Sequence, residues 1–228
     1  MENEQLVRQQ LEDAALRYAD LRYVSVEPCG EPLVPIAPNE RLSVAQIGED
    51  MRAVSGEQIY VRQSVAERLG VASLLLAAQN TGLGLQVVYG YRTLSIQQRL
   101  FDGFKAELSD RYQGDELLEA VHRLIAVPDV AGHPTGGAVD IQIVRGDEPL
   151  QFGTDIWEFA TESFTFWPFI SEVAVANRML LRAVMLAVGF APFDGEWWHF
   201  SYGDKEWAKY YDQPNAIYEQ LTWESTGV

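Results

Sequence analysis

The chain has 228 residues, 47% of them apolar, which is enough to bury one substantial core. With 33 acidic and 17 basic side chains, its formal net charge of −16 repels nucleic acid and anionic lipid surfaces, so neither is an expected partner. The apolar stretches are shorter than the roughly 20 residues of a membrane-spanning helix, and the polar N-terminal segment lacks the pattern of a secretion signal. We therefore predict a cytoplasmic protein with no membrane partner. A lone cysteine, Cys29, predicts no disulfide.

The first predicted element is an amphipathic helix. Apolar and aromatic residues recur there at helical spacing, namely Val7, Leu11, Ala14 and Tyr18. This pattern predicts a helical extension over about 1–20 that packs on the rest of the chain. The proline-rich segment 28–38 is predicted to be irregular. No repeat or linker marks a boundary, so we predict a single domain over 1–228.

Two capping pairs predict the next helices, because a serine is followed three residues later by Glu or Gln. The first helix starts at Ser64 and ends near Gly82, and the second starts at Ser95. A strand over 85–91 separates them, and a third, short helix is predicted over 116–125.

In the C-terminal half, residues 138–144 alternate strictly between apolar and polar. This alternation predicts a strand with its apolar residues on one face and Asp140 on the other. A buried helix is predicted over 171–188, followed by an aromatic strand over 196–202. Helices and strands mix without a regular βαβ period, which predicts an α+β fold.

The residues with the chemistry of a metal site lie in two segments. His133 stands in AGHPTGGAVD, where a glycine-rich turn leads into the strand that carries Asp140. His199 closes GEWWHF, three residues after Glu196. Imidazole and carboxylate groups are good zinc ligands, and a catalytic site needs three of them together with a general base. Glu196 is the candidate base.

Taken singly, each of these residues has a more ordinary explanation. A histidine beside glycines is usually a loop residue, and an aspartate such as Asp140 is usually found at a strand end or in a turn. The pair Trp197 and Trp198 is more often core than the wall of a substrate site. Spacing alone therefore leaves the site undecided.

Four motifs that occur in order along the chain favour the functional explanation over the ordinary one. They are DLRY (20–23), GYR (90–92), HPTGGAVD (133–140) and, over 177–200, NRMLLRAVMLAVGF followed by EWWHF. Together they resemble the zinc D-alanyl-D-alanine peptidases, particularly the dipeptidases associated with vancomycin resistance. The resemblance covers most of the chain. It implies a small antiparallel sheet flanked by helices, in a hedgehog-like single domain.

The resemblance also implies roles for individual residues. One Zn²⁺ per chain would be held by His133, Asp140 and His199, with Glu196 as the base. Arg92 would polarise the scissile carbonyl and stabilise the oxyanion, a role that suits a permanently charged guanidinium. The ordinary alternative for Arg92 is a surface salt bridge.

The implied substrate is the small dipeptide D-Ala-D-Ala, because EWWH with its second tryptophan, Trp198, resembles the dipeptidase branch. Tyr23 matches a tyrosine near the substrate amino group, and we favour Asp155 over Glu158 as its anionic partner. Ala131 replaces the serine that the family usually has two residues before the first histidine. This replacement keeps a zinc D,D-carboxypeptidase or a broader dipeptidase open as alternatives. A non-catalytic zinc-binding module is a third. The sequence leaves the oligomeric state open.

Overall fold

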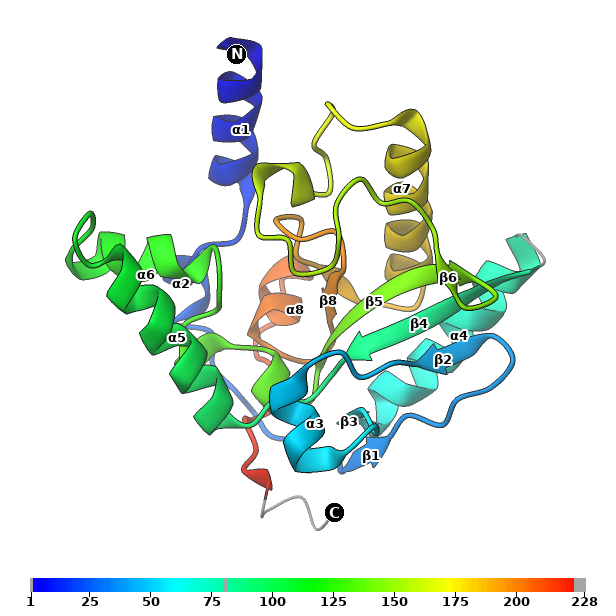
Figure 1. The fold of residues 1–228 in the computed structure, drawn as a ribbon. Coiled ribbons are helices and arrows are strands. Elements are labelled where there is room, and N and C mark those ends of the chain that lie inside the picture. Colours follow the sequence, from blue (N-terminus) through cyan, green and yellow to red (C-terminus); the bar gives the residue numbers. More distant parts are fainter. Residues whose placement is uncertain (1, 80–81, 224–228) are drawn as a thin grey trace.

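The computed structural model describes residues 2–79 and 82–223 (Figure 1). The α-helices are α1 (Glu2–Ala14), α2 (Tyr18–Leu21), α3 (Glu49–Ser55), α4 (Gln63–Gln79), α5 (Leu94–Leu108), α6 (Gly114–His122), α7 (Glu172–Ala187) and α8 (Lys205–Tyr210). The strands are β1 (Leu33–Pro35), β2 (Leu42–Val44), β3 (Tyr60–Arg62), β4 (Leu83–Tyr89), β5 (Ala138–Arg145), β6 (Glu148–Pro149), β7 (Ala191–Pro192) and β8 (His199–Ser201). None of the described helices combines the length and the apolar character that crossing a membrane requires.

The main sheet has the order β2-β4-β5-β8-β7, with β6 paired to β5. Its pairs are antiparallel except β2 with β4, which is parallel, and β1 and β3 form a separate antiparallel pair. The predicted α+β class is therefore confirmed, with one parallel pair added to the expected antiparallel sheet. That pair is possible because α3, β3 and α4 form the long connection that parallel strands need.

The core lies on one face of this sheet. Val139, Ile141 and Ile143 of β5 are completely buried in a cluster with apolar residues of α4 and α7. The predicted alternation of β5 is thus correct, and it sends Asp140 to the opposite face. A second apolar cluster joins α2, α5 and α6, which Figure 1 shows on the other side of the molecule from α7.

The helix starts differ from the predicted ones. Helix α4 begins at Gln63. Ser64 does not cap this helix, because its amide and its hydroxyl both donate hydrogen bonds to the carboxylate of Glu31. Thr93, not Ser95, caps α5 by accepting from the amide of Ile96 at 3.3 Å. Each serine is therefore the second residue of its helix.

The predicted N-terminal helix is in fact two helices. Arg17 is extended, and its guanidinium lies 3.1 Å from the carboxylate of Asp20, so a new helix, α2, starts at Tyr18. Tyr18 is buried with α5 and α6, whereas Leu6 in α1 is 60% exposed. Helix α2 therefore packs as predicted, whereas α1 is covered only in part, with Val7 and Leu11 half-buried and Ala14 exposed. Figure 1 shows α1 projecting from the rest of the chain.

Candidate active site

Strand pairing brings two distant parts of the chain together at one end of the sheet. Asp140 of β5 is the register partner of His199 in β8. His133 lies in a short 3₁₀ turn (His133–Thr135) just before β5. Gly136 ends this turn at φ +75°, where a Cβ would lie 2.3 Å from Leu33. A glycine is therefore required for the turn to place His133 beside Asp140.

The three side chains form a compact group of donors. One ligand atom from each of His133, Asp140 and His199 lies within 4.8 Å of the others, and all three residues are buried. Asp140 Oδ1 is 3.1 Å from His199 Nδ1 and 3.5 Å from His133 Nε2. Because metal–ligand bonds to nitrogen and oxygen are about 2.0–2.2 Å long, such spacing suits three donors around one ion. The group can hold a metal ion.

Outer partners orient each of these donors. His133 Nδ1 donates to the carbonyl of Gly90 at 2.7 Å, which leaves Nε2 free of a proton and directed to Asp140. Trp157 Nε1 donates to Asp140 Oδ2 at 2.8 Å. His199 Nε2 lies 3.5 Å from Glu206 Oε2. For His133 the hydrogen bond to Gly90 fixes the ring tautomer that metal binding needs, and for His199 the nearby carboxylate of Glu206 is an electrostatic partner.

The charges of the group are coupled. Burial opposes ionisation of Asp140, but His133 and His199 outweigh it and hold the pKa of this carboxyl far below its usual range. Burial lowers the pKa of His133. Burial also opposes the charged form of His199, yet hydrogen bonding to Asp140 and Glu206 raises its pKa well above the usual value. The histidines therefore stand in unlike environments around one carboxylate.

Glu196 lies in a turn between β7 and β8, not in the strand predicted from 196. The amide of Glu196 donates to Phe193 O at 3.0 Å, and that of His199 donates to Glu196 O at 3.2 Å. Residues three apart on a regular strand point to opposite faces, so the turn is what allows Glu196 and His199 to line one cavity. Burial raises the pKa of Glu196 to about 8.

Arg92 is fixed in the same cavity. Its Nε donates to the hydroxyl of Tyr89 at 3.1 Å and its Nη1 to Gln97 Oε1 at 2.9 Å. The guanidinium also lies 4.7 Å from the centre of the Tyr89 ring. Arg92 is 7% exposed and makes no salt bridge to any acidic side chain in the described part of the chain. Among residues 2–79 and 82–223 no hydrogen-bond partner occupies its Nη2.

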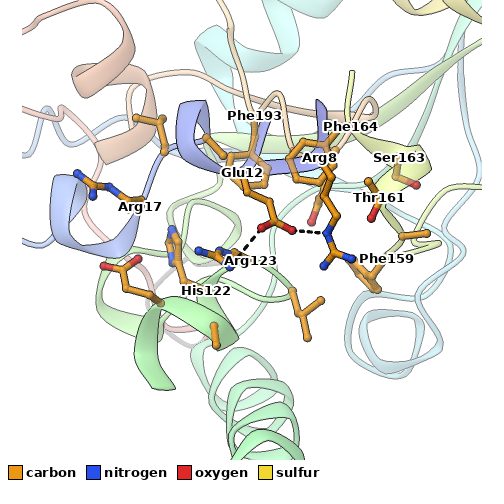
Figure 2. Close-up of a pocket in the computed structure, with 18 of the residues that line it drawn as sticks. Arg8, Glu12, Arg17, His122, Arg123, Phe159, Thr161, Ser163, Phe164 and Phe193 are labelled. Atoms are coloured by element: carbon orange, nitrogen blue, oxygen red, sulfur yellow. Dashed lines mark hydrogen bonds and ion pairs between the residues drawn. The ribbon is translucent and has the colours of Figure 1, made fainter. Parts of the chain in front are cut away.

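Two adjoining cavities meet at Glu196. The metal cavity holds the donor group, Arg92 and Glu196, and has a volume of about 50 Å³. The outer cavity, of about 370 Å³, lies between α1, α6 and the loop 159–164 (Figure 2). The two share a wall made of His122, Leu124, Phe159, Phe193 and Glu196.

The predicted substrate residues do not all reach these cavities. Trp198 is completely buried and lines the outer cavity. Tyr23 is 82% exposed, with the guanidinium of Arg22 5.1 Å from its ring centre, and lines neither cavity. Asp155 is exposed and lines a separate hollow near β6. The structure therefore places Trp198 in the wall of the outer cavity, and neither Tyr23 nor Asp155 in the wall of either cavity.

Sequence reasoning does not identify several residues of the site. Glu206, which faces His199, belongs to no motif and lies in the first turn of α8. For Trp157 the sequence indicates only aromatic bulk, yet this residue orients Asp140. His122 stands in no motif either, although it lines both cavities. For Glu206 the one available signal is its position seven residues after His199, which is weak by itself.

The raised pKa of Glu196 predicts how the stability of the metal-free protein changes with pH. Its folded value of about 8 exceeds the ordinary 4.5, so folding retains a proton that the unfolded chain releases between these values. Stability of the metal-free protein should therefore fall as pH rises through this window. Glu196→Gln should flatten that fall, measured as Tm between pH 5 and 8 after chelation. Equal slopes in both proteins would contradict the assignment.

Comparison with known proteins places the chain in a family. Residues 46–219 match the family model described as D-ala-D-ala dipeptidase. A D-alanyl-D-alanine dipeptidase of Synechocystis sp. is 30% identical over 88% of this chain and 93% of its own length. That of Escherichia coli is 29% identical over 57% of this chain and 61% of its own length.

Among solved structures, the LD-carboxypeptidase LdcB is 22% identical, with a TM-score of 0.45 over 88% of this chain and 78% of its own. The family match spans the strands and turns that carry the donor group, Glu196 and Arg92. The chain belongs to the D-Ala-D-Ala dipeptidase family of peptidases.

Proposed function

We propose that this protein is a zinc-dependent dipeptidase that hydrolyses D-Ala-D-Ala to two molecules of D-alanine. The observation that carries the proposal is the buried group of His133, Asp140 and His199 in one cavity with Glu196 and Arg92. Two imidazoles and a carboxylate are a typical ligand set of catalytic zinc, which keeps a further position open. Family membership supports the substrate class.

When bound, zinc supplies a Lewis acid that lowers the pKa of water and polarises a carbonyl. Glu196 then takes a proton from the attacking water as the oxygen adds to the scissile carbonyl carbon. The C–N bond breaks when Glu196 passes that proton to the leaving amine, which completes the hydrolysis.

Arg92 supplies the second protein contribution. Tyr89 and Gln97 hold its Nε and Nη1, so the guanidinium has one orientation before substrate arrives. A fixed positive charge that faces the developing oxyanion stabilises the transition state without further reorganisation. This placement, together with that of Glu196, favours an enzyme over a non-catalytic zinc-binding module, since such a module needs neither group.

Metal removal tests the function directly. Purified protein should release D-alanine from D-Ala-D-Ala, chelation should abolish the release, and stoichiometric zinc should restore it. Turnover that survives complete metal removal would reject the mechanism. Zinc bound at one per chain with no hydrolysis across a panel of peptides would favour the non-catalytic module.

Within this chemistry, the enzyme could accept only the free dipeptide or a broader range of peptides. Tyr23 and Asp155, the candidates for recognition of the substrate amine, lie away from the metal cavity. This observation favours a second candidate function, a broader dipeptidase or a D,D-carboxypeptidase. We also keep a cytoplasmic location as a prediction, to be tested by fractionation.

A substrate panel separates the narrow activity from the broad one. A dipeptidase that recognises the free amine should cleave D-Ala-D-Ala at least about tenfold faster than its N-acetyl derivative, because blocking the amine removes a charged contact. The measurement is kcat/KM for both peptides. Equal values would establish the broader activity and remove Tyr23 and Asp155 as amine contacts.

A further inference from the structure

A four-residue turn carries Trp157 into the metal cavity. The amide of Glu158 donates to the carbonyl of Asp155 at 3.3 Å, which closes the turn, and Trp157 is its third residue. Asp155, Ile156 and Glu158 line the separate hollow near β6, whereas Trp157 lines the metal cavity. The turn therefore directs the side chain of Trp157, and none of its other three, to the metal cavity.

The backbone of Trp157 has a conformation that aromatic residues rarely adopt. Its φ is +67°, and Asp212 is the one other non-glycine residue with a positive φ among residues 2–79 and 82–223. The third position of a turn with this backbone normally holds glycine or asparagine, because a bulky side chain is strained there. A tryptophan that occupies such a position must be held by contacts of its side chain.

Two contacts hold the indole of Trp157. Its ring meets that of Tyr89 edge-on at 5.2 Å, and its Nε1 donates to Asp140 Oδ2 at 2.8 Å. Asp140 is only 2% exposed, and a hydrogen bond to a buried carboxylate is among the stronger ones in a protein. Core packing, the ordinary role of a tryptophan, explains the contact of the ring with Tyr89. It does not explain why the N–H group points at a metal ligand.

The two oxygens of the Asp140 carboxylate have different partners. Oδ1 is 3.1 Å from His199 Nδ1 and 3.5 Å from His133 Nε2. Ligand atoms around a tetrahedral zinc, with bonds of about 2.0–2.1 Å, are about 3.3–3.4 Å apart, so Oδ1 has the spacing of a ligand from both nitrogens. Oδ2 accepts the hydrogen bond of Trp157 instead. A carboxylate held in this way presents one oxygen to the ion.

We propose that Trp157 is a positioning residue that makes Asp140 a one-oxygen ligand and so keeps a coordination position of the zinc open for water. A carboxylate without an outer partner can turn so that both oxygens bind the ion, which fills a position that a catalytic zinc needs for water. The strained backbone of Trp157 is the consequence of this placement. The inference rests on the metal site of the proposed function and concerns the geometry of that site.

Two variants remove the N–H group, and a third serves as the control. Trp157→Phe keeps an aromatic ring beside Tyr89 but lacks the donor. Trp157→Gly also lacks the donor and suits the left-handed backbone, so the test does not depend on the folding of one variant. The control is Trp197→Phe, because Trp197 Nε1 likewise donates a hydrogen bond, to Thr154 Oγ1 at 2.9 Å, but Trp197 lines neither cavity. Tm of each metal-free protein checks folding.

Cobalt in place of zinc reports the coordination number, because the visible absorption of Co²⁺ weakens as further ligands bind. The probe is Co²⁺ alone, titrated into the metal-free full-length protein to one ion per chain. Trp197→Phe should absorb as wild type does, whereas Trp157→Phe and Trp157→Gly should absorb more weakly by about half or more, because a second oxygen of Asp140 binds. Their zinc affinity, from chelator competition, should also fall about ten- to a hundredfold. The cobalt spectrum decides, since affinity responds to general packing as well.

The outcomes separate this inference from the proposed function. Cobalt spectra of the folded Trp157 variants that match wild type would overturn the positioning role, whatever the turnover of D-Ala-D-Ala. An equal loss of absorption in Trp197→Phe would overturn it too, because the effect would then come from packing. If the spectra differ as expected but wild type with zinc releases no D-alanine, the peptidase function fails and the positioning role stands.

Discussion

Glu196→Gln should lower kcat for D-Ala-D-Ala by about a hundred- to ten-thousandfold, the usual contribution of a positioned general base. The glutamine side-chain amide has nearly the size of the Glu196 carboxylate but cannot take the proton of the attacking water. Glu196 stands outside the donor group of His133, Asp140 and His199, so zinc content should remain near that of wild type. Steady-state kinetics and metal analysis on the same preparation measure both quantities.

The matched control is Glu148→Gln, because Glu148 is an exposed glutamate of β6 outside both cavities. This variant should keep the kcat of wild type. A Glu196→Gln enzyme with kcat near wild type would remove Glu196 as the base. A variant that loses zinc together with activity would instead make Glu196 part of the metal site.

Asp140→Asn should have the other large effect, on metal affinity. Asp140 is the only anion of the donor group, and its Oδ1 lies closest to both histidines, at 3.1 and 3.5 Å. Loss of an outer partner alone costs about ten- to a hundredfold in metal affinity, and loss of a charged ligand should exceed that range. At limiting zinc, Asp140→Asn should therefore lose its activity because it no longer retains the metal. Zinc competition with a chromophoric chelator gives the dissociation constant.

Asp147→Asn is the corresponding control, since Asp147 is exposed in the turn between β5 and β6. Its zinc affinity should equal that of wild type. Unchanged zinc affinity in Asp140→Asn would show that the metal does not bind at this group. Trp157, whose indole donates to Asp140 Oδ2, can still donate to the amide oxygen, so gross misfolding is not expected.

The local sequence pattern was sufficient to predict the structure where neighbouring residues decide the conformation. The alternation of β5 placed Asp140 opposite the apolar face because side chains on a strand alternate by stereochemistry alone. Gly136 in the left-handed region explains the turn that presents His133. The predicted helix starts were displaced, since Ser64 and Ser95 match the capping pattern but α4 begins at Gln63 and α5 begins at Leu94, after the Thr93 cap.

Long-range packing decided the rest. The sequence by itself established the α+β class, the family motifs and a set of candidate ligands, because these depend on residue type and short spacing. Only the tertiary structure put Glu196 in a turn beside His199, added Glu206 and His122 to the cavity walls, and left Tyr23 exposed. Which side chains share a cavity depends on strand register and on the docking of α6 and α8, and these are set by contacts between residues far apart in the chain.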